Sequence, residues 1–210
     1  ARELSLKEIK EIHQSVSIPL EAFVHGALCV SYSGQCYASQ YCFGRSANRG
    51  RCAQFCRLKF DLIDSDGKVM IKDKHLLSLR DMNRSSSIEK MIDAGISSFK
   101  IEGRLKDLPY VKNLTAFYRT EIDKIIQRRN GELERSSDGT SHFTFTPVPE
   151  KSFNRGFTDY FLHGRTQDIY SFNTPKSIGT YIGIVKRINK KSIIIGEPSE
   201  SVEPRISAGD

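Results

Sequence analysis

Five cysteines lie between positions 29 and 56, and the rest of the chain contains none. Thiolates at four corners can bind zinc or hold an iron-sulfur cluster. The spacing C-x6-C-x5-C-x9-C-x3-C matches neither paired CxxC zinc ribbons nor ferredoxin runs, so spacing alone leaves both metals open. The alternative is that these are buried free cysteines acting as small hydrophobes. A loop rich in Ser, Gly and Arg fits that alternative poorly, so metal or redox chemistry is favoured.

A second chemical group follows the cysteines. Lys100, Glu102 and Arg104 alternate along a predicted strand and its exit, so they share one face of a sheet. Glu21 and His25 are separated by an even number of residues and are predicted to point the same way. We therefore take these five as candidate catalytic residues, with Glu102 as the proton-handling group. The alternatives are a structural ion network for the charged residues and a structural role for His25.

Arginines surround the cysteines. Their guanidinium groups can pair bidentately with phosphate or with a carboxylate-bearing donor, or they can balance the negative charge of a metal cluster. The candidate substrate-binding arginines are Arg45, Arg49, Arg51 and Arg57.

A later stretch mixes aromatic and polar residues. Asn154 and Arg155 lie beside Phe153, Phe157 and Tyr160, a combination suited to stacking a base and pairing its backbone. We take Asn154 and Arg155 as further candidates for substrate binding. The alternative is that the aromatic residues belong to the core.

Composition limits the kind of protein. The 210 residues suffice for one large or two small domains, and 32 Lys and Arg against 25 Asp and Glu give a net charge of +7. That charge permits a polyanionic partner without requiring one. There is no apolar run near 18 residues and no basic-then-apolar leader opens the chain, so we expect a cytoplasmic protein without a membrane span. Disulfides are disfavoured in that compartment.

The predicted elements alternate between strands and helices, which favours a parallel α/β arrangement. They are a helix at 5–16, a strand at 18–26, a hairpin at 60–71, a strand at 75–79, a helix at 85–95, a strand at 96–103 and a helix at 108–129. These strands are too few to close an eight-stranded barrel, so we expect part of a larger fold. A structured connector over 135–175 and the opening of a small β domain over 176–210 complete the prediction.

Four stretches resemble the collagenase-like peptidase family U32. They are EAFVHGALCVSYSGQC at 21–36, GRSANRGRCAQFCR at 44–57, SSFKIEGRLK at 97–106 and KSFNRGFTDYF at 151–161. The resemblance covers nearly the whole chain. Within the family, the sequence is most similar to the branch that hydroxylates tRNA at the wobble uridine, which is related to an rRNA cytidine hydroxylase and to anaerobic ubiquinone hydroxylation proteins.

The resemblance implies the later portion of a triosephosphate-isomerase-like barrel over 1–134, with the cysteine loop at 29–56 and with both ends of the protein truncated. It also implies a C-terminal β-barrel-like domain that begins at 176, and prephenate as the oxygen donor. Its 4Fe-4S cluster has ligands at Cys29, Cys36, Cys52 and Cys56, whereas Cys42 has no counterpart. Zinc is the alternative metal.

Three functions fit these features. The first is an iron-sulfur enzyme that hydroxylates carbon 5 of a tRNA wobble uridine. The second is a collagenase-type peptidase, which is disfavoured because the sequence has neither an HExxH helix nor a GxSxG elbow. The third is a non-enzymatic RNA-binding module stabilised by a cluster. The sequence does not predict the oligomeric state.

We predict that the intact protein binds one 4Fe-4S cluster. Single serine replacements of Cys29, Cys36, Cys52 or Cys56 should abolish the brown chromophore after anaerobic purification, because each removes one thiolate ligand. Cys42→Ser, as the matched control, should keep it. Iron, sulfide and zinc analysis checks the result, and stoichiometric zinc without labile sulfide would contradict it.

Overall fold

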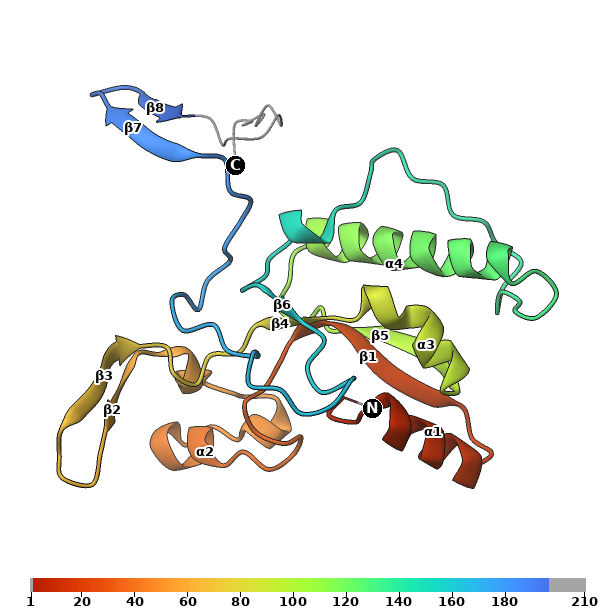
Figure 1. Ribbon diagram of the computed structural model, residues 1–210, viewed down its shortest axis with the longest axis horizontal. Helices are drawn as coiled ribbons and strands as arrows, with labels where there is room; N and C mark the ends of the chain where they lie inside the picture. The colour runs from red at the N-terminus through yellow and green to blue at the C-terminus, as the bar shows by residue number, and fades with distance from the viewer. Residues whose placement is uncertain (1, 197–210) are drawn as a thin grey trace. The chain divides into compact units, whose positions relative to one another are not determined.

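The chain divides into two compact units, Ala1–Ile178 and Gly179–Asp210, and the computed structural model describes residues 2–196 (Figure 1). The first unit is a mixed α/β domain built on a four-stranded sheet. No helix within residues 2–196 has the length and apolar character that crossing a bilayer requires.

The sheet of the first unit has the strand order β5-β1-β4-β6. Its strands are β1 (Leu20–Ala27), β4 (Asp81–Asn83), β5 (Ile96–Ile101) and β6 (Phe157–Thr158). The predicted parallel arrangement is confirmed for β1 with β5. β4 and β6, neither of which was predicted as a strand, also pair parallel. The parallel arrangement is wrong for β1 with β4, which pair antiparallel. The chain between β1 and β4 forms a loop and a hairpin rather than a crossover helix. β4 therefore starts at the end of the sheet where β1 finishes.

Three helices were correctly predicted. They are α1 (Leu6–Ser15), α3 (Ile88–Asp93, preceded by the short 3-10 turn η3, Ser85–Ser87) and α4 (Leu108–Arg128). Ser5 and Glu8 form a capping box at the start of α1, and the Asp107 side chain accepts a hydrogen bond from the Tyr110 amide at the start of α4. Capping by these short polar residues explains why both helices begin where they do.

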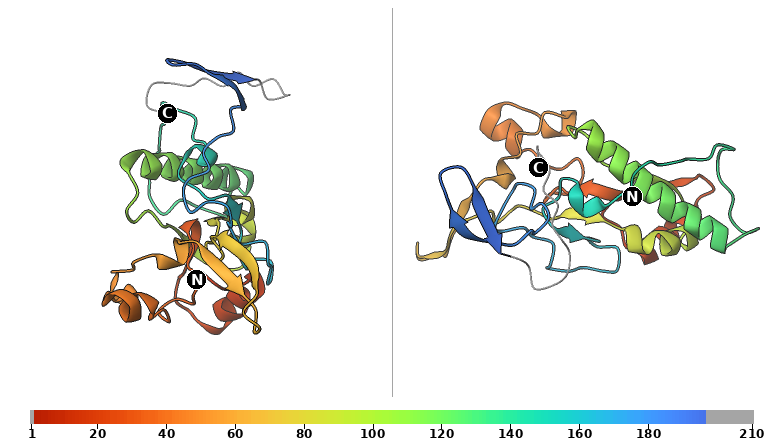
Figure 2. Two further views of the ribbon diagram at one scale, coloured as in Figure 1. Left: turned by 90° about the vertical axis from the view of Figure 1, so that its left-hand side faces the viewer. Right: turned by 90° about the horizontal axis from the view of Figure 1, so that it is seen from above.

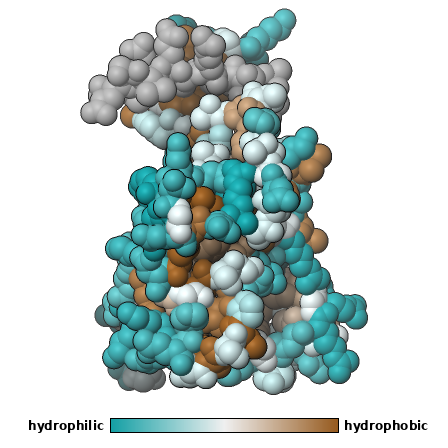
Figure 3. All heavy atoms as spheres, turned by 90° about the vertical axis from the view of Figure 1, so that its right-hand side faces the viewer, coloured by the Kyte–Doolittle hydropathy of each residue, from teal (hydrophilic) through white to brown (hydrophobic). Residues whose placement is uncertain are grey.

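The three helices pack against β1 and β5 through one apolar cluster (Figure 2). Ala22 and Val24 of β1 are fully buried in it, whereas Phe23 packs partly into a second cluster around Met82 and Leu79. Side chains of a strand alternate between its two faces, so the clusters lie on opposite faces of the sheet. Figure 3 shows one face of this unit, on which apolar side chains are exposed between hydrophilic ones.

The predicted hairpin is confirmed, as β2 (Phe60–Ile63) and β3 (Val69–Lys74) joined by a turn. The Asp64 carboxylate fixes the turn by accepting hydrogen bonds from the amides of Asp66 and Lys68. The prediction of a strand at 75–79 is wrong. Residues 76 and 77 form a turn, and Leu79 makes only an isolated bridge to Tyr170, so the segment forms no strand.

A buried ion pair joins β4 to the segment before β6. Arg155 Nη1 donates to both carboxylate oxygens of Asp81, at 2.9 and 3.0 Å, and the Arg155 amide donates to one of them at 2.8 Å. Arg155 Nε donates to the carbonyl of Pro175 at 2.8 Å. The side chains are 7% and 2% exposed, so water contributes little to solvating either charge. This pair therefore fixes the returning connector to the sheet.

His25 is buried between the sheet and α4. Its Nδ1 lies 3.1 Å from the hydroxyl of Tyr118, and the rings of Tyr110 and Phe157 contact its imidazole. The pairing of β1 with β5 is irregular between Phe23 and His25. This irregularity turns His25 toward the helices, so the prediction that His25 and Glu21 share a face is wrong.

The second unit, as far as it is described, is an antiparallel hairpin. It consists of β7 (Ile184–Ile188) and β8 (Ile193–Gly196), which confirms the two predicted β-rich runs. The rest of the predicted small β domain, residues 197–210, lies outside the described residues.

Breaking the Asp81–Arg155 pair should strongly destabilise the first unit. Asp81→Asn leaves the Arg155 charge buried without its counter-ion, and we expect the free energy of unfolding to fall by about 3 to 5 kcal/mol. Urea titration of the intact protein measures this. Asp168→Asn is the matched control, because it removes a carboxylate from the exposed pair with Arg80 and should cost less than about 1 kcal/mol. Equal losses in both variants would contradict the assignment.

Burial lowers the pKa of His25 to about 4. The unfolded chain binds the proton near pH 6.5, so folding stability from the neutral imidazole is complete above that pH and is lost as the pH falls toward 4. Over this range the wild type should lose about 3 kcal/mol relative to His25→Gln, which cannot titrate. Denaturant titrations of both proteins at several pH values measure the difference, and parallel curves would disprove it.

Candidate functional site

The segments that carry the candidate residues meet at one end of the sheet, where β1 and β5 finish. The cysteine loop leaves β1 there, and residues 102–106 leave β5 there. β4 runs antiparallel to β1, and β6 runs parallel to β4. The starts of β4 and β6 therefore lie at this same end of the sheet. Asp81 is the first residue of β4, and Arg155 lies just before β6. The carboxyl ends of parallel strands are where α/β proteins place their ligand sites.

The cysteine loop folds into three short helical turns. They are α2 (Ala38–Phe43), η1 (Ala47–Arg49) and η2 (Phe55–Arg57). All five thiols are free, and Cys36 and Cys56 are half-buried while the other three are exposed. The Cys52 sulfur accepts a hydrogen bond from the amide of Gln54 at 3.3 Å, and the Ser39 hydroxyl lies 3.8 Å from it. An amide directed at a sulfur stabilises a thiolate.

Three other cysteines affect the pKa of the Cys56 thiol. Burial raises its pKa, the Arg57 guanidinium lowers it, and the thiolates of Cys29, Cys52 and Cys36 raise it further. These are the four residues that the family resemblance implies as ligands, and four soft sulfur donors suit an iron-sulfur cluster or zinc. Among residues 2–196, no three His, Cys, Asp or Glu side chains stand close enough to hold a metal ion. The ligand set therefore stays a prediction.

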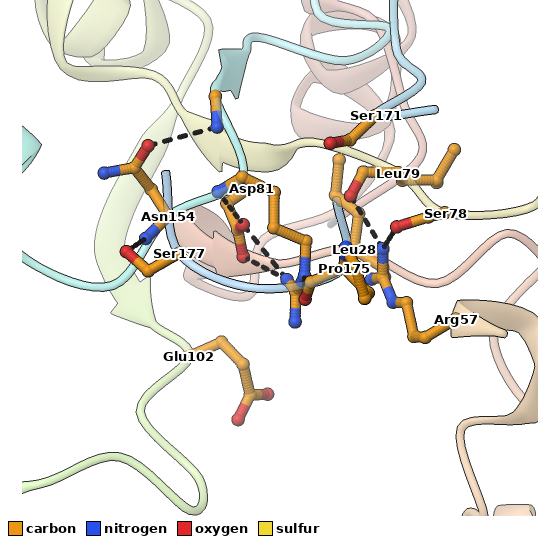
Figure 4. Close-up of polar contacts among 12 residues, drawn as sticks. Leu28, Arg57, Ser78, Leu79, Asp81, Glu102, Asn154, Ser171, Pro175 and Ser177 are labelled. Carbon is orange, nitrogen blue, oxygen red and sulfur yellow. Dashed lines mark hydrogen bonds and ion pairs between the residues drawn. The ribbon is translucent and has the colours of Figure 1, made fainter. Parts of the chain in front are cut away.

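Two arginines from the predicted site hold the cysteine loop in place. Arg57 donates to the Ser78 hydroxyl and to the carbonyls of Leu79 and Leu28, at 2.7 to 2.9 Å (Figure 4). Burial lowers its pKa, with the nearby Arg155 charge acting in the same direction. Arg104 donates to the Gly50 carbonyl at 2.7 Å. Both guanidinium groups therefore bind backbone of this chain, and a role in catalysis or substrate binding stays a prediction for each.

A charged group occupies the exposed face of β1 and β5. Lys100 Nζ lies 3.6 Å from a Glu21 carboxylate oxygen, and it also faces the Phe23 ring at 5.2 Å from the ring centroid. The Arg2 guanidinium covers the same ring at 4.3 Å and lies 4.0 Å from the Glu102 carboxylate. Three of the predicted catalytic residues are thus brought together, with Arg2 and Phe23 added. Figure 4 shows the Glu102 carboxylate pointing away from Asp81.

The remaining candidates divide between the surface and the interior. Arg45, Arg49 and Arg51 are exposed, and their side chains have no bonding partner within residues 2–196. Two exposed tyrosines of the same loop, Tyr37 and Tyr41, add aromatic surface; Tyr41 is 93% exposed.

Asn154 and Arg155 are buried instead. The Asn154 amide donates to the carbonyls of Glu150 and Ser152 and accepts from the Gly156 amide. Both side chains therefore stabilise the connector in this structure, and substrate binding by them stays a prediction.

Asp81 and Lys106 were also missed from sequence. Asp81 lies in a three-residue strand outside every motif, so no local signal identified it. Lys106 ends the stretch SSFKIEGRLK, and its ammonium lies 3.3 Å from the centroid of the Phe153 ring. Its place in that stretch was the available signal.

Known proteins with similar sequences include RNA hydroxylation proteins and collagenases. The 23S rRNA 5-hydroxycytidine C2501 synthase of Escherichia coli is 50% identical over 94% of this chain and 30% of its own length. A tRNA hydroxylation protein P1 of Bacillus subtilis is 42% identical over 59% of the chain and 31% of its own length. A collagenase of Porphyromonas gingivalis is 34% identical over 79% of the chain and 41% of its own length.

The chain therefore spans less than half the length of these relatives. No solved structure is significantly similar to it. Residues 1–171 match Peptidase family U32. The match extends from α1 to the connector, through the cysteine loop and the charged face of the sheet, and the chain belongs to Peptidase family U32.

Proposed function

We propose that this chain is part of an RNA hydroxylase that replaces the hydrogen at carbon 5 of a pyrimidine with a hydroxyl group. The observation that carries the proposal is the 50% identity to the 23S rRNA 5-hydroxycytidine synthase over 94% of the chain. A cytidine of 23S rRNA is therefore the favoured target. A tRNA wobble uridine is the second, supported by the tRNA hydroxylation proteins at 42% and 34% identity.

The exposed face of β1 and β5 is proposed to bind the reacting base. Hydroxylation removes a proton from carbon 5, and Glu102 is a carboxylate at a strand end, half-exposed and partnered by Arg2. Lys100 provides a hydrogen-bond donor beside Glu21, where it can hold a carbonyl oxygen of the base. Prephenate is proposed as the oxygen source on the strength of the family resemblance.

The cysteine loop is proposed to hold a 4Fe-4S cluster through Cys29, Cys36, Cys52 and Cys56, with zinc as the alternative. A bound cluster would supply electron-transfer chemistry beside the site. Two observations support this: the thiols of Cys29, Cys36 and Cys52 act electrostatically on Cys56, and Arg57 clamps the loop.

RNA is proposed to contact the exposed side of the same loop. Arg45, Arg49 and Arg51 offer guanidinium groups to phosphates, and Tyr37 and Tyr41 offer rings on which bases can stack. An RNA partner also agrees with the net charge of +7 and with a cytoplasmic location.

The rest of the catalytic domain is proposed to come from other parts of the protein. The chain spans 30% of its 50% identical relative, and β5 and β6 are the edge strands of the described sheet. Further strands that pair with these edges could complete a barrel of the triosephosphate-isomerase type.

Peptidase activity is the second candidate, because a collagenase is 34% identical over 79% of the chain. Mass spectrometry of RNA nucleosides separates the candidates. Deletion of the gene should remove 5-hydroxycytidine from 23S rRNA, or 5-hydroxyuridine derivatives from tRNA, and the intact gene should restore them. Unchanged nucleosides together with peptide cleavage by the purified protein would establish the peptidase.

Complementation with Glu102→Gln should lower the hydroxylated product at least a hundredfold, since a positioned acid or base contributes about 10² to 10⁴ in rate. RNA affinity should stay within about threefold, because the amide keeps the size of the carboxylate. Glu134→Gln, at an exposed position outside the sheet, is the matched control and should retain full product. Retained product in Glu102→Gln would remove Glu102 from proton transfer.

A further inference from the structure

A cavity of about 510 Å³ lies at the start of α4, apart from the cysteine loop and from the exposed face of β1 and β5. Tyr110 and Asn113 line it from α4, and Phe145, Val148 and Phe153 line it from the connector. Its volume falls in the range of pockets that bind small molecules or a single nucleotide. The proposed hydroxylation site uses none of these residues.

The charges around the cavity favour an anion. Lys112 and Lys151 line it with exposed side chains. Asp107 is the one carboxylate among the described lining residues, and it is occupied in capping α4 through the Tyr110 amide. The N-terminal end of a 21-residue helix adds partial positive charge.

Lys106 does not line the cavity, but it is a third cation that contacts two of the cavity's rings. Its ammonium lies 3.3 Å from the centroid of the Phe153 ring and 5.4 Å from that of Tyr110, the two rings that also line the cavity. Within residues 2–196 this ammonium has neither an ion-pair partner nor a hydrogen-bond acceptor. The Asp81 carboxylate is already paired with Arg155, so Asp81 and Asp107 act on the charge of Lys106 without a direct ion pair.

The residue before Lys106 has an unusual backbone conformation. Leu105 adopts a left-handed conformation, with φ of 62°, although its side chain is 87% exposed and gains little from packing. Non-glycine residues rarely adopt this conformation, and such strain concentrates at ligand sites. Burial also lowers the pKa of Lys106.

We propose that this cavity binds an oxyanion, either a phosphate or a carboxylate, and that Lys106, Lys112 and Lys151 anchor it. The anion has two possible sources, a phosphate of the RNA or the carboxylate of a small organic acid. The proposal rests on the proposed function only for the choice of RNA and of the acid used as probes.

The test compares lysine variants of the intact protein. Lys112→Met with Lys151→Met removes the two exposed cations, and Lys106→Met removes the third. Lys106→Arg keeps the charge and the contact with the rings. Lys10→Met with Lys90→Met is the matched control, because both lysines are exposed on other helices and line no part of the cavity.

Two binding measurements distinguish the sources. Fluorescence anisotropy with a short RNA at several salt concentrations reports phosphate contacts, and calorimetry with prephenate and with inorganic phosphate reports a small anion. If RNA supplies the anion, Lys106→Met and the Lys112/Lys151 double variant should each weaken RNA binding at least fivefold. The double variant should also lower the salt slope by about one to two. Lys106→Arg should stay within about twofold of the wild type.

If a small acid supplies the anion, RNA affinity stays unchanged and prephenate or phosphate affinity falls at least fivefold. Wild-type affinity for all three probes in Lys106→Met and in the Lys112/Lys151 double variant would overturn the inference and leave the proposed hydroxylase standing. Weaker binding in these variants, together with unchanged RNA nucleosides after gene deletion, would support the cavity and reject the hydroxylase.

Discussion

The arrangement of the first unit depends on the ion pair between Asp81 and Arg155. β4 has three residues and β6 has two, too few for their backbone ladders to hold them in the sheet. The buried carboxylate accepts from both the amide and the guanidinium of Arg155, while the guanidinium also holds the carbonyl of Pro175. One desolvated pair thereby joins the sheet to two parts of the connector. The connector in turn supplies Phe153 and Val148, which line the cavity together with residues of α4.

Three arginines of this fold clamp backbone carbonyls. Arg84 is fully buried and donates to the carbonyls of Asp159, Phe23 and Arg2, and burial lowers its pKa to about 10. Arg57 and Arg104 do the same for the cysteine loop. A planar group with five donors can satisfy several carbonyls where the chain forms no regular ladder. The cysteine loop is irregular over much of its length, so it depends on these clamps for its position.

The irregular pairing of β1 with β5 separates two environments. Before it, Glu21 and Phe23 face the exposed side of the sheet with Lys100. After it, His25 faces α4 and is held neutral among aromatic rings. A strand that would otherwise present a carboxylate and an imidazole to one site presents them to opposite sides. The exposed face is thereby left with carboxylates and cations, and the imidazole becomes part of the packing.

Much of the local structure follows from the sequence alone. Ser5 and Asp107 mark the starts of two helices, Asp64 marks a turn, and the clustered cysteines mark one loop, because capping, turn and thiol chemistry act over a few residues. The shared face of Lys100 and Glu102 follows from alternation along a strand.

Only the tertiary structure decided the reversed direction of β4, the orientation of His25 and the burial of Arg155. Each depends on contacts between residues more than 50 positions apart, such as Ala27 with Asp81 or His25 with Tyr118, and a local sequence pattern does not reveal such contacts. The position of Lys106 against Phe153 likewise depends on a contact between residues that are far apart in the sequence. Charge and spacing identified the groups that are able to do chemistry, and long-range packing determined which of them remain exposed to a ligand.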